Sequence, residues 1–238
     1  MGLFKKKAAP VPQEQVLPRH IGIIMDGNGR WAQKRALPRM AGHRFGAEKF
    51  KKINEYCLDR NIECVTFFAF STENWKRSAE EVKNIMELFI DYLEEWLTMD
   101  DSKNMRVRFL GDRSVLSERA QALMADVEAK SQKFKNQLNI AINYGARAEL
   151  VRAANLLKDK PGPITEQDLS DALYTQGQPE VDLIIRTGGE KRISNFLLWQ
   201  AAYAEIYFCD TLWPDMQEKD IDQALEFFAS RQRRFGKA

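Results

Sequence analysis

The stretch IGIIMDGNGRW (residues 21–31) is a short apolar run that passes through two glycines into a basic and aromatic segment. An apolar run of about four to eight residues that ends at turn-forming residues is typical of a buried strand. Further short apolar runs follow along the chain at 65–70, 107–110, 138–142 and 183–185. We therefore expect five buried strands, the first at 21–25.

The segments between these runs have helical periodicity. The clearest is 78–97, where Val82, Ile85 and Phe89 begin a series of apolar residues spaced three or four apart, which gives one broad apolar face. Ser117 and Thr165 are suitable N-cap residues. Further helices are expected at 43–61, 117–134, 147–158, 165–173 and 218–233. Strands that alternate with helices predict an α/β fold, with a central, mostly parallel sheet flanked by helices on both faces.

The length and composition bound the architecture. A chain of 238 residues is suited to one domain with one substantial core. Residues 1–18 contain three prolines and a lysine run, so we expect a flexible lead-in there and a folded domain at 19–238. No apolar run approaches the roughly 18 residues of a membrane-spanning helix. We expect no transmembrane segment.

Charge and cysteine content exclude other classes of protein. The formal net charge of +2 is too small for nucleic-acid binding by bulk electrostatics, so anion recognition must come from local arginine clusters. The three cysteines form no CxxC pair, which argues against a disulfide framework or a thiolate zinc site. A reducing cytosol fits this composition best.

The first candidate site follows the first predicted strand, since ligands bind beyond the carboxyl ends of strands in such sheets. Gly27, Gly29 and Arg30 suit a diphosphate, because glycines admit a close approach and arginine provides a bidentate donor. Asp26 beside them suits a magnesium ligand or a proton acceptor. Simple turn chemistry explains this segment equally well, and by itself the segment favours that interpretation. It matches neither the P-loop nor the dinucleotide fingerprint.

The second candidate site, at 70–77, leaves an aromatic strand and enters the long amphipathic helix. Ser71, Asn74 and Arg77 would lie on a lid above a substrate whose hydrocarbon lies beneath. Trp75 as core filler and Arg77 as a solvated charge are the simpler alternatives. Stacking of Trp75 on nucleic acid is disfavoured by the charge balance.

The third candidate site, at 184–195, repeats the order of strand, paired glycines and arginine, and a helix is expected after it. Arg186 and Arg192 would bind a second diphosphate there, and Arg39 and His43 extend the basic set near the first site. Two such arrangements in one chain are harder to explain as turns than one. His20 is interpreted as structural.

Four stretches together resemble bacterial undecaprenyl diphosphate synthases, which are cis-prenyltransferases. They are IIMDGNGRW (23–31), AFSTENW (69–75), NIAINYGAR (139–147) and RTGGEKRISNFLLWQAAYAEIY (186–207), and the similarity extends from about residue 18 to 235. The resemblance implies magnesium-dependent condensation of isopentenyl diphosphate onto an allylic diphosphate, such as farnesyl diphosphate. The implied product is undecaprenyl diphosphate, the precursor of the lipid carrier for cell-wall synthesis. It also implies a homodimer, with a hydrophobic tunnel beside the sheet.

The resemblance implies roles for individual residues. Asp26 and Asn74 would be catalytic, and Asp26 and Glu205 would hold Mg²⁺, with Glu205 approaching from the partner subunit. The substrate-binding residues would be Gly27, Asn28, Gly29, Arg30, Trp31, Arg39, His43, Ser71, Thr72, Glu73, Trp75, Arg77, Arg186, Arg192 and Ser194. Lys191 departs from the pattern, because certain relatives have histidine there, and lysine cannot replace a neutral imidazole while it keeps its proton.

Four apolar residues are candidates for the lining of the implied tunnel. Ala69, Phe89, Leu93 and Leu138 would line the tunnel, although core packing explains them equally well.

We expect a cytoplasmic protein with transient, peripheral contact at the inner face of the cell membrane during product release. A trans-prenyl synthase would be all-helical and carry DDxxD, whereas 100–104 read DDSKN. A noncatalytic subunit of a two-component enzyme need not retain both diphosphate sites.

Overall fold

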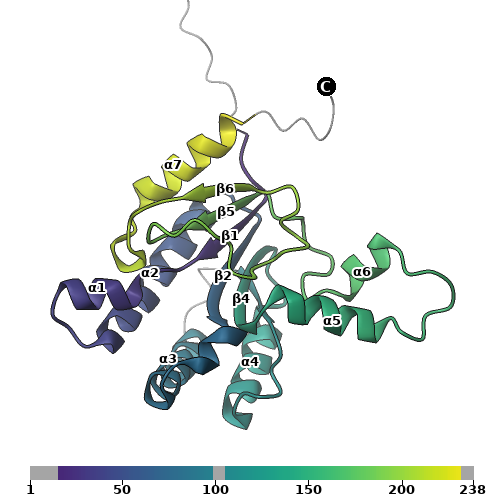
Figure 1. Cartoon of the computed structure of the whole chain (residues 1–238), viewed down its shortest axis with the longest axis horizontal. Coiled ribbons are helices and arrows are strands. Elements are labelled where there is room, and N and C mark those ends of the chain that lie inside the picture. Colours follow the sequence, from purple (N-terminus) through teal and green to yellow (C-terminus); the bar gives the residue numbers. More distant parts are fainter. Residues whose placement is uncertain (1–15, 99–104, 232–238) are drawn as a thin grey trace, which may run out of the picture.

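The computed structural model describes residues 16–98 and 105–231, and its centre is a parallel sheet (Figure 1). The strand order is β3-β4-β2-β1-β5-β6, and every neighbouring pair is parallel. The strands are β1 (His20–Ile24), β2 (Cys64–Ser71), β3 (Met105–Leu110), β4 (Asn136–Tyr144), β5 (Leu183–Arg186) and β6 (Glu205–Phe208). The predicted lead-in lies outside the described residues except for 16–18.

Strand β6 is absent from the sequence prediction. It forms one edge of the sheet, and all four of its residues are only half-buried. An edge strand of four residues that includes Glu205 lacks the continuous apolar run by which buried parallel strands are recognised. The other five strands confirm the predicted ones.

The six helices predicted by residue range are confirmed with shifted ends. They are α2 (Arg39–Asp59), α3 (Ala79–Thr98), α4 (Glu118–Ser131), α5 (Ala146–Leu156), α6 (Glu166–Ala172) and α7 (Glu218–Ala229). A further short helix, α1 (Asn28–Lys34), begins at the glycine-rich segment that follows β1. Helix α2 begins four residues before the expected start, directly after Pro38. Ser117 and Thr165 cap α4 and α6, since their hydroxyl oxygens accept from the backbone N–H groups of Ala120 and Asp168 at 3.3 and 3.2 Å.

The helix expected after the third loop is wrong. Residues 187–204 form turns between β5 and β6. Ser194, Asn195 and Leu197 have φ angles of 50°, 62° and 46°, in the left-handed region that a right-handed helix cannot contain. These turns instead fold residues 193–204 back against the sheet.

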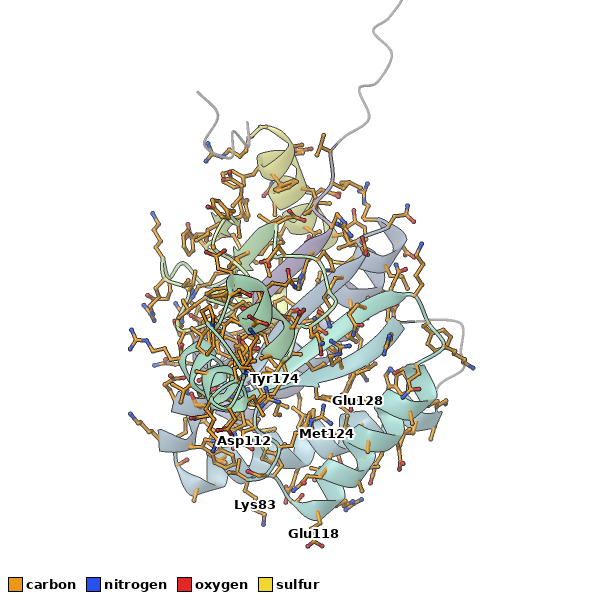
Figure 2. All side chains as sticks on the ribbon, turned by 90° about the vertical axis from the view of Figure 1, so that its right-hand side faces the viewer. Lys83, Asp112, Glu118, Met124, Glu128 and Tyr174 are labelled. Atoms are coloured by element: carbon orange, nitrogen blue, oxygen red, sulfur yellow. The ribbon has the colours of Figure 1, made fainter. Side chains whose placement is uncertain are left out.

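The two faces of the sheet pack against different layers, because successive residues of a strand point to opposite faces. Ile21 and Ile23 of β1 belong to the larger core, which helices α2, α3, α4 and α7 cover. Ile24 faces the smaller core on the other side, with Phe196 and Leu197 from the turns after β5. Figure 2 shows that Met124 on α4, which is fully buried, points toward the sheet. Burial of each such apolar side chain stabilises the fold by about 1.5–3 kcal/mol.

A buried polar layer lies between β1, β2 and β4. The ring of His20 is fully buried, with Nδ1 2.8 Å from the carbonyl oxygen of Pro179 and Nε2 2.7 Å from the hydroxyl oxygen of Thr66. Because a carbonyl only accepts, Nδ1 carries the proton and Nε2 accepts from Thr66. Asn139 donates to the same hydroxyl oxygen at 2.8 Å. Burial lowers the pKa of His20 to about 4, so the ring is neutral at physiological pH.

Within residues 16–98 and 105–231, every helix is too short or too polar to cross a bilayer.

Acid should destabilise the protein through His20. Between pH 6.5 and about 4 the unfolded chain binds a proton at this imidazole while the folded chain does not. Stability that is fully present above pH 6.5 is therefore lost as the pH falls through this window, by up to about 3 kcal/mol from this group. Urea unfolding at about pH 7 and about pH 4.5 measures the loss. His20→Gln removes the titrating group and should lose less stability, and an equal loss in both proteins would contradict the prediction.

Candidate functional site

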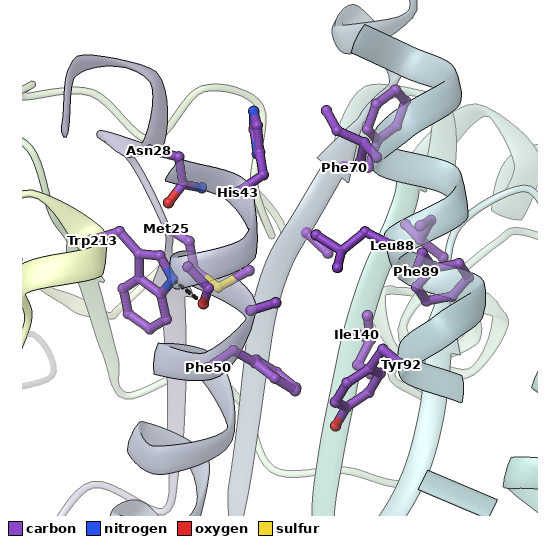
Figure 3. Close-up of a pocket in the computed structure, with 15 residues that line it drawn as sticks. Met25, Asn28, His43, Phe50, Phe70, Leu88, Phe89, Tyr92, Ile140 and Trp213 are labelled. Atoms are coloured by element: carbon purple, nitrogen blue, oxygen red, sulfur yellow. Dashed lines mark hydrogen bonds between the residues drawn. The ribbon is translucent and has the colours of Figure 1, made fainter. Parts of the chain in front are cut away.

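Two adjoining pockets open at the carboxyl ends of β1, β2 and β5. The polar pocket has a volume of about 640 Å³. It is lined by Ile24, Met25, Asp26, Asn28, His43, Phe68, Ala69, Ser71, Glu73, Asn74, Arg77, Ile85, Arg147, Arg186, Arg192, Ser194 and Asn195. The apolar pocket has a volume of about 110 Å³ and lies between α2 and α3 (Figure 3).

The apolar pocket is continuous with the polar one. It is lined by Met25, Asn28, His43, Gly46, Ala47, Phe50, Ala69, Phe70, Ile85, Leu88, Phe89, Tyr92, Ile140, Ile142 and Trp213. Met25, Asn28, His43, Ala69 and Ile85 line both pockets. A ligand with an anionic head and an apolar tail would therefore find complementary surfaces side by side.

A bulge in β2 shapes the floor of both pockets. Phe68 pairs with Ala141 of β4 and Phe70 pairs with Ile142, so Ala69 is an extra residue in the ladder. Ala69 is exposed although it lies in a central strand, whereas Phe70 is buried. Such bulges redirect side chains beside functional sites. Of the other expected tunnel residues, Phe89 lines the apolar pocket, whereas Leu93 and Leu138 are buried in the core.

Asp26 joins the first and third loops. Its Oδ1 lies 3.0 Å from Nη2 of Arg30, and its Oδ2 lies 2.9 Å from Nη2 of Arg186. Arg30 also donates to the carbonyl oxygen of Gly188 at 2.6 Å. The two loops, each predicted to bind its own diphosphate, are therefore in direct contact, because β1 and β5 are neighbours in the sheet.

Arg186 is the most buried cation of the pocket, with a side chain only 5% exposed. Its Nη1 donates to the hydroxyl oxygen of Ser194 at 2.7 Å and to the carbonyl oxygen of Arg192. The Arg192 side chain is exposed and forms an ion pair with Glu190 at 2.5 Å. The adjacent Lys191 is also exposed.

Buried polar atoms without partners gather at this pocket. In the described residues, Oδ1 of Asn28, Nε2 of His43 and Nε of Arg186 are buried and make no hydrogen bond, and the Glu81 Oε1 that faces His43 Nε2 is 3.5 Å away and does not satisfy it. Buried polar atoms are normally hydrogen-bonded, so three unpaired ones around one pocket indicate a missing polar ligand. Arg77, Arg147, Arg186 and Arg192 outnumber the carboxylates in the lining, which favours an anion. Burial, together with Arg77, lowers the pKa of His43 and keeps it neutral.

The lid (residues 71–77) contains a short 3₁₀ helix at Thr72–Lys76. The side-chain oxygen of Asn74 accepts from the backbone N–H of Ser71 at 3.0 Å and fixes the start of this turn. Trp75 donates through its ring nitrogen to Oδ1 of Asn143 at 2.7 Å, and its ring contacts Phe70 edge to face. The lid is thus held by both polar and aromatic contacts.

The structure gathers most of the predicted site residues in the polar pocket. Those that line it are Asp26, Asn28, His43, Ser71, Glu73, Asn74, Arg77, Arg186, Arg192 and Ser194. Gly27 caps α1 beside Asp26, Gly29 and Arg30 lie in the first turn of that helix, and Thr72 and Trp75 belong to the lid. Arg39 lies beside Gly29, because a Cβ added to Gly29 would be 3.1 Å from the Arg39 Nε.

Trp31 and Glu205 lie away from the polar pocket. Trp31 is buried, donates to Oδ1 of Asp215 at 2.7 Å and contacts Phe45. Glu205 is level with Leu183 at the amino end of β5, and it faces Arg231 at 3.6 Å. Because Asp26 follows the carboxyl end of β1, one chain does not bring Glu205 to it.

Two polar residues of the pocket lining were missing from the predicted set. Arg147 lies in the first turn of α5, and Asn195 follows Ser194. Oδ1 of Asn195 accepts from the backbone N–H of Arg147 at 2.9 Å, and its amide nitrogen donates to Glu73 at 3.2 Å. Arg147 lies in the NYGAR stretch and Asn195 lies beside Ser194, so both are near residues that the sequence indicated. Neither position in the sequence reveals that the two residues connect to the lid.

Comparison with known proteins identifies the family. The family model "Putative undecaprenyl diphosphate synthase" matches residues 24–236. The chain belongs to the undecaprenyl diphosphate synthase family, and it is a cis-prenyltransferase. This membership confirms the predicted family, and the six-stranded parallel sheet confirms the predicted α/β fold class.

Relatives of this family match almost the whole chain. An isoprenyl transferase of Aquifex aeolicus is 48% identical over 223 residues, 93% of this chain and 96% of the relative. The ditrans,polycis-undecaprenyl-diphosphate synthase ((2E,6E)-farnesyl-diphosphate specific) of Legionella pneumophila is 45% identical, covering 92% and 96%. The crystal structure of lavandulyl diphosphate synthase from Lavandula x intermedia in complex with dimethylallyl diphosphate has a TM-score of 0.87 at 33% identity, covering 93% and 99%. That of a "probable undecaprenyl diphosphate synthase" from Campylobacter jejuni has a TM-score of 0.79 at 37% identity, covering 92% and 99%.

Gly188→Ala should weaken anion binding. An added Cβ would lie 2.7 Å from Nη2 of Arg30 and 3.0 Å from the carbonyl oxygen of Asp26, so it would displace the arginine. We expect the Kd for inorganic pyrophosphate, measured by calorimetry, to rise by about tenfold, the effect of one charge-assisted hydrogen bond. Gly162→Ala is the matched control, since Gly162 has φ 81° against 84° for Gly188 but no atom of the described residues within 4 Å of the added carbon. Equal pyrophosphate binding by both variants would contradict the prediction.

Proposed function

We propose that this cis-prenyltransferase adds isopentenyl diphosphate units to farnesyl diphosphate in a magnesium-dependent, sequential reaction. The proposed product is undecaprenyl diphosphate, the precursor of a lipid carrier for cell-wall synthesis. The observation that carries the proposal is the continuity between a cationic pocket with unpaired buried polar atoms and an apolar pocket between α2 and α3. The Legionella relative named as farnesyl-diphosphate specific supports the choice of allylic substrate.

The pocket residues divide into two substrate sites. Asp26, Asn28, His43 and the first loop would surround the allylic diphosphate, whose hydrocarbon would enter the apolar pocket past Met25 and Ala69. Arg186, Arg192 and Ser194 would hold isopentenyl diphosphate. Contact between the first and third loops through Asp26 supports this assignment, because two carbons that are to be bonded must lie close together.

The reaction breaks the allylic C–O bond and forms a bond to the terminal carbon of isopentenyl diphosphate, after which that unit loses a proton. Arg30 and Arg77 would stabilise the charge that builds on the departing diphosphate, and one such preorganised donor contributes about 3 kcal/mol. Three acceptors would serve for the proton: Asp26, a relay through Asn74, or the diphosphate itself. By excluding water, the lid would protect the carbocation-like allylic carbon from hydrolysis.

Asp26 would hold the magnesium ion. In the described parts of the chain no three His, Cys, Asp or Glu side chains gather as a metal cluster. This donor set still fits, because Mg²⁺ commonly binds through one or two carboxylates, substrate phosphates and water. When bound, the ion neutralises charge on the diphosphate oxygens. On substrate binding, one of the two arginines would turn from Asp26 to the diphosphate. Asp26 would keep the other arginine as its partner, so all three charges would still face an opposite charge.

A homodimer would complete the site. Glu205 lies on β6, an edge strand whose outer backbone groups can be covered by a second subunit. Glu205 of the partner subunit would then approach Asp26, which the same chain's Glu205 does not reach. Transient contact with a membrane surface would assist release of the apolar product, whose affinity grows with each buried methylene.

Product analysis tests the proposed function directly. Purified protein, farnesyl diphosphate, labelled isopentenyl diphosphate and magnesium should yield long polyprenyl diphosphates, sized by chromatography after dephosphorylation. A chelator should abolish elongation. Product formation that persists without divalent cations, or no elongation at all, would refute the proposal.

Asp26→Asn should nearly abolish turnover while the sheet and helices are kept. The amide keeps the size of the carboxylate but carries no charge for the metal, so kcat should fall by at least about 100-fold. Steady-state kinetics measures the loss, and circular dichroism verifies the fold. Asp222→Asn removes another aspartate paired with an arginine, on α7, and should leave kcat unchanged. Normal turnover by Asp26→Asn would contradict the assignment.

Arg192→Ala should chiefly raise the KM for isopentenyl diphosphate, because its exposed guanidinium belongs to the loop assigned to that substrate. A rise of about tenfold or more, with a smaller change in the KM for farnesyl diphosphate, is expected from the loss of one charge-assisted contact. Arg119→Ala, which removes an exposed arginine that forms an ion pair with Glu94 away from the pocket lining, is the control. An unchanged KM for isopentenyl diphosphate in Arg192→Ala would remove this residue from the site.

A further inference from the structure

We propose that Glu81 is a positioning residue that holds Arg39, His43 and Arg77 together and thereby fixes the lid to helix α2. Glu81 lies on the first turn of α3, and its side chain is 14% exposed. Its Oε1 is 3.0 Å from the Arg39 Nε, 2.9 Å from the Arg77 Nη1 and 3.5 Å from the His43 Nε2. One carboxylate oxygen thus faces three basic groups. The inference rests on the proposed function, since His43 and Arg77 are the pocket-lining groups assigned to the allylic diphosphate.

The three groups come from two separate parts of the chain. Arg39 and His43 lie one helical turn apart at the start of α2, whereas Arg77 ends the lid and precedes α3. Two guanidinium groups that share one oxygen would repel each other without the negative charge between them. The carboxylate therefore permits the approach of α2 and the lid at this point.

Glu81 contacts its basic partners from outside the lining of the polar pocket. Arg77 and His43 line the polar pocket, whereas Glu81 and Arg39 are not among its lining residues. The Arg39 Nε that faces Glu81 also lies beside Gly29 in the first turn of α1. A carboxylate in this place orients the side chains that meet the diphosphate without occupying the diphosphate's own position.

The opposite role is an internal anion that competes with substrate for the same cations. Removal of such a competitor would tighten the binding of a diphosphate, whereas removal of a positioning group would weaken it. The direction of the change in affinity therefore separates the two roles.

Calorimetry of the full chain with inorganic pyrophosphate tests the inference, with Glu81→Gln as the main variant. The amide still accepts hydrogen bonds but loses the charge, so we expect the Kd to rise by about tenfold. Glu80→Gln is the matched control, because this neighbour on the same turn is exposed and has no ion pair among the described residues. Its Kd should stay at the wild-type value. Unchanged or tighter binding by Glu81→Gln would overturn the positioning role.

Proton NMR of the two histidines gives a second readout that a purely structural residue would not move. His43 faces Glu81, Arg39 and Arg77, and Glu81 is the group that raises its pKa against burial and the two arginines. The pKa of His43 should therefore fall further in Glu81→Gln and stay unchanged in Glu80→Gln. The signals are assigned with His20→Gln. An unchanged His43 pKa in Glu81→Gln would contradict the proposed contact.

Glu81→Asp keeps the charge and withdraws it by one methylene, so it tests the inference even if Glu81→Gln fails to fold. We expect an intermediate rise in the Kd for pyrophosphate, with a smaller shift in the pKa of His43 than in Glu81→Gln. A wild-type Kd in Glu81→Asp together with an unchanged His43 pKa would overturn the inference. Wild-type protein that binds pyrophosphate but elongates no prenyl chain would overturn only the proposed function.

Discussion

The carboxylate of Asp26, placed between Arg30 and Arg186, is the interaction on which the rest of the site depends. A guanidinium as buried as that of Arg186 is stable only with a partner of opposite charge, because desolvation of an unpaired cation costs several kcal/mol. Asp26 provides that partner across the junction of β1 and β5. The same contact fixes Arg30 over Gly188, where a side chain would not fit. Removal of the carboxylate would disturb two loops at once, so its structural and chemical roles are coupled.

The position of this ion-pair cluster above an apolar pocket follows from the sheet. Parallel strands end at one edge, so the polar loops of β1, β2 and β5 meet there, while helices α2 and α3 cover the larger core beneath. The extra residue Ala69 leaves the ladder of β2 where the two pockets join. A small side chain at that point leaves room for a tail to pass from the polar pocket to the apolar one. The amphipathic shape of a prenyl diphosphate is thus matched by the order of layers in the fold.

The lid is held to two different parts of the molecule. At the end of the lid, Glu81 connects Arg77 to helix α2 through Arg39 and His43. Near its start, Glu73 accepts a hydrogen bond from Asn195 in the loop assigned to isopentenyl diphosphate. Both contacts are polar and lie within or beside the pocket, so a charged ligand in the pocket would act electrostatically on both attachments of the lid.

The sequence by itself determined the α/β class, five of the six strands, the helices and their caps, and the family, because apolar periodicity, capping residues and glycine-arginine loops are local signals. It also indicated the three loops that carry the site. Only the tertiary structure decided that the first and third loops share Asp26, that Trp31 contacts Asp215 instead of the pocket, and that Arg147, Asn195 and Glu81 belong to the same neighbourhood. The helix predicted after β5 was wrong because left-handed residues at 194, 195 and 197 turn the chain back toward the sheet. Each of these outcomes depends on strand order and on contacts between residues far apart in the chain, which no local pattern specifies.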